Sequence, residues 1–225
     1  MSVAYLSNRF PELVEPYVCA EIGELRKRDC AVLPCSFRRP KQVPRSLAGF
    51  AGETLYIFPL RWTKVLSASW LCLRRFPRIA DLIWRAVRGP EPTTRRLRTL
   101  AHTWLGAYLA VLLRHRFITH IHVHHGYFSA WAGMVAGRLL GVGFSMTLHG
   151  SDLLVRADYL DAKLKNCHFC VTISNFNRRH IIEHYPEVDP GKILVHHLGV
   201  DLEVWQPPVS DPPNDRFSIL SVGRI

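Results

Sequence analysis

Two stretches of this chain run from apolar residues directly into polar ones whose side chains could do chemistry. Thr147-Leu-His-Gly-Ser-Asp152 ends in a histidine, which can donate or accept a hydrogen bond, and a glycine that lets a ligand approach the backbone. A solvated His149 in a turn followed by an Asp152 helix cap would explain this stretch equally well.

The second stretch, Val171-Thr-Ile-Ser-Asn175, also has the form of a strand that ends in polar residues before a helix. Such a junction offers free backbone N–H groups to a phosphate or a sugar hydroxyl. Ser174 taken alone is better explained as a helix N-cap. A third stretch, His196-His-Leu-Gly-Val-Asp201, has a glycine that permits a sharp turn, and we interpret Asp201 as a structural residue of that turn.

Elements that could bring these stretches together follow from the spacing of apolar residues. The sequence opens with a predicted strand, helix and strand, at Val3–Leu6, Glu15–Arg28 and Ala31–Cys35. This order favours a parallel α/β sheet. Further strands are expected at Thr54–Phe58, Ile121–His124, Phe144–Leu148, His168–Ile173 and Ile193–His196. Further helices are expected at Ser129–Leu140, near Tyr159–Lys165 and at Asn175–Tyr185. The predicted fold class is therefore α/β, with a Rossmann-like parallel sheet flanked by helices.

The region from Thr63 to Arg116 is expected to be mostly helical, with interruptions near Pro77 and at Gly89–Pro92. Between Trp62 and Arg98, tryptophans are interleaved with arginines, an arrangement that suits an anionic membrane surface. A packed tryptophan face with solvated arginines would explain it as well.

The character of the chain changes after residue 200. Gln206–Asp215 is polar and rich in proline, which is typical of an interdomain linker, and Phe217–Val222 is expected to be a new strand. We predict a domain at residues 1–200, a linker at 201–216 and the start of a second domain at 217–225. A lone strand cannot pair its backbone, so we expect the second domain to be truncated.

Composition limits the function classes. Lys and Arg outnumber Asp and Glu by 29 to 18, which favours anionic partners. The N-terminus lacks the pattern of a secretory signal, and the apolar stretch Leu100–Leu113 is too short to span a bilayer. We expect a cytoplasmic protein, on the inner face of the cytoplasmic membrane if it is peripheral, with its six cysteines reduced in the core.

In order and spacing, the three stretches resemble the strand-HG-S/F-D, strand-S-x-x-N and HxGVD pattern of family 4 glycosyltransferases of the GT-B fold. Three further segments are similar to ones in exopolysaccharide and colanic-acid-type members of this family: Arg9-Phe-Pro11, Glu21-Ile-Gly-Glu-Leu25 and Ile121-His-Val-His124. Two departures stand out. The family's Ser-Glu-Thr-Phe is here Val14-Glu-Pro-Tyr17, and His125 replaces a phenylalanine.

The resemblance implies a hexosyl-type transferase that moves a sugar, with retention, from a nucleotide sugar to a glycan or lipid-linked acceptor in cell-surface polysaccharide synthesis. It implies His149 as the catalytic, sugar-facing residue and Arg224 at the donor diphosphate, with no metal or cofactor. The residues it implies for substrate binding are Glu15, Gly150, Asp152, Ser174 and Asn175. Since the chain holds only the acceptor-side half, we expect it to be inactive alone.

Features of the sequence also suggest four other functions. His120–His125 and Cys167-His-Phe-Cys170 suggest zinc, but strand alternation puts His122 and His124 on one face and His125 on the other, so no metal is expected. The basic charge would suit nucleic acid, but no binding module is present and no nucleic-acid partner is expected. A sugar-nucleotide epimerase of the same fold stays open, as does an inactive acceptor- or membrane-binding module.

Overall fold

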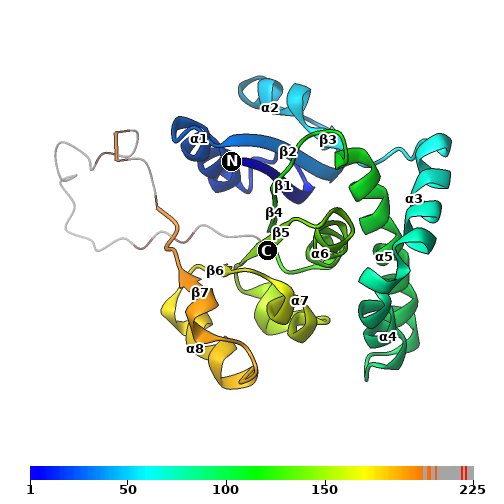
Figure 1. Cartoon of the computed structure of the whole chain (residues 1–225). Helices are drawn as coiled ribbons and strands as arrows, with labels where there is room; N and C mark the ends of the chain where they lie inside the picture. The colour runs from blue at the N-terminus through cyan, green and yellow to red at the C-terminus, as the bar shows by residue number, and fades with distance from the viewer. Residues whose placement is uncertain (200–201, 204–205, 207–218, 220, 222–225) are drawn as a thin grey trace.

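The computed structural model describes residues 1–199, 202–203, 206, 219 and 221, and a seven-stranded, all-parallel sheet crosses the described part (Figure 1). The strand order is β3-β2-β1-β4-β5-β6-β7. The strands are β1 (Ser2–Arg9), β2 (Ala31–Arg38), β3 (Leu55–Tyr56), β4 (His120–His124), β5 (Gly143–Leu148), β6 (Cys170–Thr172) and β7 (Ile193–Val195). This confirms the predicted α/β fold class.

Helices connect the strands. They are α1 (Pro16–Lys27), α2 (Ala48–Glu53), α3 (Trp62–Arg74), α4 (Ala80–Arg88), α5 (Thr93–Leu113), α6 (Phe128–Leu140), α7 (Leu160–Asn166) and α8 (Asn175–His184). Four shorter helical turns are η1 (Arg45–Leu47), η2 (Phe76–Arg78), η4 (Pro190–Lys192) and η3 (Ser151–Val155), a single π-helical turn directly after β5. No described helix is both long enough and apolar enough to cross a bilayer.

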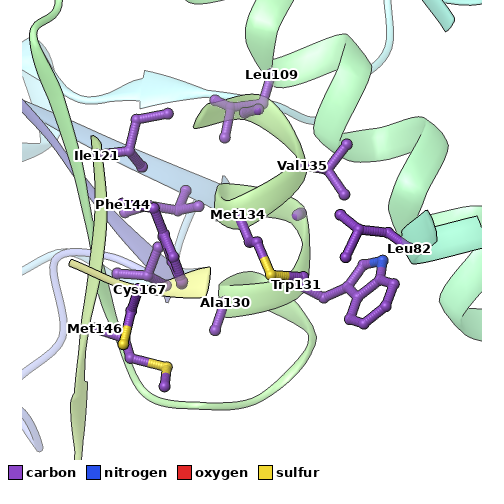
Figure 2. Packing of buried hydrophobic residues seen from close by; sticks show 14 of the residues in the cluster. Leu82, Leu109, Ile121, Ala130, Trp131, Met134, Val135, Phe144, Met146 and Cys167 are labelled. Atoms are coloured by element: carbon purple, nitrogen blue, oxygen red, sulfur yellow. The ribbon is translucent and has the colours of Figure 1, made fainter. Parts of the chain in front are cut away.

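Alternation along β1 separates two apolar clusters. Ala4 and Leu6 belong to the larger cluster, on the face covered by α6, with α5, α3 and α4 packed outside it. Tyr5 points the other way, into a smaller cluster with α1 residues Val18 and Ile22. Figure 2 shows part of the larger cluster, with Trp131 of α6 beside Leu82 of α4.

The connections that leave β1 and β4 run in opposite directions. From β1 the chain passes through α1 to β2, whereas from β4 it passes through α6 to β5 on the other side of β1. Helices α1 and α6 pack on opposite faces, because α1 covers Tyr5 and α6 covers Leu6. In doubly wound sheets this reversal opens a crevice at the carboxyl ends of the two strands, where ligands bind.

Most predicted elements lie where expected, with shifted ends. The predicted strand Thr54–Phe58 is reduced to Leu55–Tyr56, because this edge strand pairs only with β2 at Cys35 and Ser36. The helical region after Thr63 is interrupted near Pro77 and again at residues 89–92, as expected. The short helices α2 and η3 were not predicted.

The six cysteines are free and at least half-buried, as expected, with Cys35, Cys167 and Cys170 in the core. The predicted linker at 201–216 and strand at 217–222 lie almost entirely outside the described residues.

Candidate functional site

His149 and His124 meet at the carboxyl edge of the sheet. Strands β4 and β5 are neighbours with His124 opposite Thr147, so the residue just past β5 lies beside the end of β4. The two Nε2 atoms are 2.7 Å apart, which is a hydrogen bond. The Tyr17 ring of α1 stacks over both imidazoles, with ring centroids 5.3 Å from His124 and 5.1 Å from His149.

Behind this pair, the hydrogen bonds continue into the core. Tyr5 of β1 places its hydroxyl 3.0 Å from His124 Nδ1 and donates to the Glu21 carboxylate of α1. His124 has no exposed surface, and Tyr5 is almost fully buried. Four side chains from β1, α1, β4 and the end of β5 thus form one chain of hydrogen bonds that ends at the half-buried His149.

Both imidazoles in this series of hydrogen bonds, those of His124 and His149, are held neutral. Burial, together with the neighbouring histidines, lowers the pKa of His124 well below its usual value. Burial and the positive charge of His125 lower the pKa of His149 to about 4. Burial raises the pKa of Glu21, although the Tyr5 hydrogen bond and His196 act in the opposite direction.

The hydrogen bonds then fix which nitrogen of His149 carries the proton. An ionised Glu21 only accepts, so the Tyr5 hydroxyl gives it its proton and accepts in turn from His124 Nδ1. Neutral His124 therefore has a lone pair on Nε2, which accepts the Nε2–H of His149. His149 Nδ1 remains as a lone-pair acceptor, and no hydrogen bond joins it to the part of the chain described here.

His125 lies on the same side as His124 and His149, which corrects the prediction that strand alternation would point it away. β4 ends at His124, and His125 has a left-handed φ of 74°, so its side chain no longer follows the strand pattern. Its ring centroid is 4.6 Å from that of His149. His125 Nε2 lies 2.9 Å from the carboxylate of Glu15, which brings that predicted residue to the site.

Two carboxylates keep His125 protonated. Burial alone would lower the pKa of His125, but Asp152 and Glu15 raise it to about 9. Its Nδ1 lies 3.6 Å from Asp152, close enough for an ion pair but too long for a hydrogen bond. The site therefore holds one imidazolium beside two neutral imidazoles.

Asp152 organises the loop that carries His149. Its buried carboxylate accepts three backbone N–H groups, from Gly126 at 2.8 Å and from His149 and Gly150 at 3.0 Å each. Burial would raise the pKa of Asp152, but His125 and these amides hold it below its usual value. Gly150, predicted to lie against a ligand, has open space on its side-chain side.

Gly126 couples this loop to α7. Its N–H donates to Asp152, and its carbonyl accepts from Lys163 Nζ at 2.6 Å. A β-carbon at residue 126 would lie 2.3 Å from Leu148 Cδ2, so any larger residue here would have to displace the Leu148 side chain. Lys163 also donates to the Asp158 carbonyl at 2.6 Å, and burial lowers its pKa to about 8.

Among the remaining predicted residues, Ser174 caps α8, since its hydroxyl accepts from the Asn177 N–H at 3.1 Å. Asn175 is exposed on the first turn of α8. Asn177, which was not predicted, is buried and donates to the His149 carbonyl. Arg224, predicted to contact the donor diphosphate, and Asp201 lie outside the described residues.

Comparison with known proteins decides the family. The model of Glycosyltransferase Family 4 matches residues 14–204, most of the chain. The chain belongs to Glycosyltransferase Family 4.

Known proteins similar to this family 4 chain are longer than it is. The alpha-maltose-1-phosphate synthase of Mycolicibacterium smegmatis is 27% identical over 150 residues, which are 61% of this chain and 38% of that protein. A glycosyltransferase from Rickettsia africae matches with a TM-score of 0.54 and 17% identity, over 90% of this chain and 44% of that one. The chain thus spans less than half the length of each.

Likeness of fold extends to a further enzyme class. The UDP-GlcNAc 2-epimerase of Methanocaldococcus jannaschii matches with a TM-score of 0.50 and 10% identity, over 87% of this chain and 45% of that one. At such identities the two solved structures show the fold alone, which is one half of a GT-B architecture.

In this family 4 chain three histidines could also bind a metal by distance alone. One ring nitrogen from each of His124, His125 and His149 lies within 4.8 Å of the others. However, both nitrogens of His124 are already hydrogen-bonded, and His125 is protonated between two carboxylates. A metal would have to break the bond between His124 and His149, so hydrogen bonding is the better interpretation.

Sequence reasoning missed much of what supports the site. Nothing in the spacing singled out Tyr5 or Lys163, since each lies within an apolar strand or a helix pattern, and Glu21 was noted only as part of a family segment, with no role of its own. Asn177 could have been found, because it is the fourth residue of the S-x-x-N pattern that begins at Ser174.

Proposed function

We propose that this chain forms the acceptor-side half of a retaining glycosyltransferase. The reaction would move a hexosyl unit from a nucleotide sugar to a glycan or lipid-linked acceptor in the synthesis of a cell-surface polysaccharide. The observation that carries this proposal is the neutral His149 at the carboxyl edge of the sheet. Its hydrogen bond to His124 fixes its tautomer and leaves Nδ1 free to accept a hydrogen bond.

His149 would accept a hydrogen bond from a hydroxyl of the transferred sugar, which orients the anomeric carbon towards the acceptor. In the transfer, the bond from that carbon to the diphosphate breaks, a bond to the acceptor oxygen forms on the same face, and the proton of the acceptor hydroxyl passes to the departing diphosphate. Negative charge grows on the diphosphate, and Arg224 is the residue we propose to meet it. The chain's own groups would need no metal or cofactor for this step.

The other proposed substrate-binding residues fall into two sets. Glu15 and Asp152 hold His125 as a cation next to His149, so they would act on the substrate through that charge. Gly150 would admit the ligand, and Ser174 and Asn175 would line the cleft near the start of α8. As part of this proposal we retain a domain at residues 1–200, a linker at 201–216 and a donor-side domain from 217.

An exposed apolar stripe on α3 favours a membrane-bound acceptor. Trp62, Leu66, Trp70 and Leu73 repeat at helical spacing and are 84%, 73%, 64% and 72% exposed. Basic residues Arg61, Lys64 and Arg74 flank the stripe. Exposed tryptophans beside arginines suit an anionic bilayer surface, so we propose peripheral association with the inner face of the cytoplasmic membrane.

The test uses the natural protein that carries these residues, purified from its own organism. It is incubated with labelled nucleotide sugars and a lipid extract of the same cells. We expect label to pass into the lipid fraction with its anomeric configuration unchanged. We expect His149→Ala to reduce the rate at least about a hundredfold, and His184→Ala on α8 to leave it unchanged.

Other outcomes would replace the proposal. Conversion of a nucleotide sugar to its epimer without an acceptor would identify an epimerase. Binding of lipid extract without turnover would identify a binding module. Residues 1–225 alone are expected not to turn over a nucleotide sugar, because the diphosphate of the donor needs groups from both halves of a GT-B enzyme.

A further inference from the structure

A cavity of about 570 Å³ opens beside the histidine site. It is lined by Asn8 at the end of β1, by Tyr127 after β4 and by Arg156 after β5. The first turns of α5 and the start of α7 complete its wall. The cavity therefore occupies the crevice expected where the connections of a doubly wound sheet reverse.

Its lining is strongly cationic. One carboxylate, that of Asp158, lines the cavity together with four cations, those of Arg95, Arg98, Arg156 and Lys163. Arg95 is paired with Asp158 at 2.6 Å. Within the described residues, Arg98 and Arg156 have no carboxylate at ion-pair distance, and their guanidinium groups make no hydrogen bond.

Lys163 is the most informative of these cations, because it is only 2% exposed. Its ammonium has three donors, and two of them are used by the carbonyls of Gly126 and Asp158. A buried ammonium next to a cavity is costly unless an anion or further acceptors complete its surroundings. The third donor is available to a ligand in the cavity.

Aromatic side chains form the rest of the wall. His102 stacks on Phe128 with ring centroids 4.6 Å apart, and Trp131 and Tyr159 lie beside them. His102 is itself uncharged, because burial, Arg98 and Lys163 lower its pKa to about 4. The lining thus suits an anionic group attached to a less polar body.

The cavity and the histidine site share the loop of residues 125–127. The N–H of Gly126 meets the Asp152 carboxylate and its carbonyl meets Lys163, while the Tyr127 hydroxyl lies 2.5 Å from Ser151 Oγ. A molecule anchored by its anion in the cavity would therefore extend past Tyr127 towards His149.

We propose that this cavity is an anion subsite that binds the phosphate or diphosphate of the acceptor through Arg98, Arg156 and Lys163. The acceptor role rests on the proposed function, whereas anion binding by these three residues does not. A phosphate on a lipid and a phosphate on a free sugar have the same chemistry here, so the test includes both.

The test measures binding to the full 225-residue chain by titration calorimetry. The probes are inorganic diphosphate, a hexose 1-phosphate, and phosphatidylcholine vesicles with or without a polyprenyl phosphate. Arg98→Gln and Arg156→Gln each remove one cation from an exposed position, so we expect both variants to fold. The matched control is Arg116→Gln, at the opposite, amino end of β4.

We expect Kd for inorganic diphosphate to rise about tenfold in each variant and to stay unchanged in the control, since each lost charge-assisted bond contributes about 1.4 kcal/mol. Tighter binding of the hexose phosphate or of the doped vesicles would identify which source of phosphate the subsite prefers. Unchanged diphosphate binding in both variants, or an equal loss in Arg116→Gln, would overturn the proposal.

The two proposals fail separately. Diphosphate binding that depends on Arg98 and Arg156 in a protein that transfers no sugar supports the subsite and refutes the function. Sugar transfer by the natural protein, together with diphosphate binding that both substitutions leave unchanged, supports the function and refutes the subsite.

Discussion

His149 Nε2 donates to His124 Nε2 across 2.7 Å, so a residue at the edge of the sheet takes its tautomer from a residue with no exposed surface. The direction of each hydrogen bond from Tyr5 to His149 is set deeper in the core, where the Tyr5 hydroxyl donates to Glu21. The almost fully buried Tyr5 thus decides whether His149 accepts or donates at Nδ1.

Tyr5→Phe is expected to let His149 adopt both of its neutral tautomers. The variant leaves His124 Nδ1 buried without its partner, which should cost about 1–3 kcal/mol of unfolding free energy. In the wild type, ¹⁵N correlation spectra of labelled histidine should show the proton of His149 on Nε2, and in the variant they should show a mixture. Tyr56→Phe, which loses a hydroxyl bonded to the backbone carbonyls of Phe10 and Ala51, is the control. An unmixed His149 tautomer in Tyr5→Phe would refute the mechanism.

Asp152→Asn should destabilise the site loop. A neutral amide cannot replace a carboxylate that accepts three backbone N–H groups and faces the imidazolium of His125. We expect a loss of about 2–3 kcal/mol in urea unfolding at neutral pH. Asp189→Asn, which removes a carboxylate bonded to the single N–H of Gly191, should cost about 1 kcal/mol or less. Equal losses would mean that Asp152 is only a turn residue.

Stability should fall on the alkaline side because of His125. Its pKa is raised to about 9 in the folded state, above its value of about 6.5 in an unfolded chain. A raised pKa stabilises the fold fully below about pH 6.5, and the contribution is lost as pH rises through 9. Urea unfolding across this window should show the decline, and His125→Asn should flatten it. A decline of the same size in the variant would assign the effect to another group.

Gly106 is expected to tolerate no side chain. A β-carbon there would lie 2.7 Å from both the Ala132 carbonyl and Val135 Cβ, where α5 packs on α6. Gly106→Ala should therefore cost about 1–3 kcal/mol in thermal or urea unfolding. Gly23→Ala in α1 has open space at that position and should be neutral or stabilising by up to about 1 kcal/mol. A neutral Gly106→Ala would contradict the close packing of α5 on α6.

Removing two tryptophans should weaken membrane binding. Trp62→Ala combined with Trp70→Ala is expected to reduce flotation with phosphatidylglycerol vesicles at least about tenfold, because both side chains are largely exposed on one stripe of α3. Phe176→Ala removes an exposed aromatic from α8 instead and should have no effect. Binding to vesicles that survives the double substitution would exclude α3 as the contact.

How far the sequence predicts this fold depends on which contacts decide each element. The strands β4, β5 and β7 and the helices α1, α6 and α8 follow from local apolar spacing and were predicted to within one residue at each end, whereas β1 and β2 each run three residues further than predicted. The edge strand β3 was overestimated, since its length depends on how far β2 can pair with it. The π-helical turn η3 depends on Asp152 capturing backbone amides of its own loop, which no periodicity reveals.

The site was predictable only where residues close in sequence carry it. His149, Gly150 and Asp152 lie on one loop, as their closeness in sequence predicts. His125 was assigned to the wrong face, because its left-handed φ ends the strand alternation one residue early. Tyr5 and Glu21 were missed because their contact with His124 joins positions far apart in the chain.

That long separation has a kinetic consequence. Tyr5 and His124 are 119 positions apart, and the strands that carry them form the seam between the two halves of the sheet. Parallel pairing over such a distance forms slowly, because a long loop must close before its contacts are gained. The histidine chain can be complete only once this seam has closed. His149 therefore reaches its Nε2-protonated tautomer only after β1 has paired with β4, the pairing expected to be slowest. Refolding and the recovery of that tautomer should share one rate.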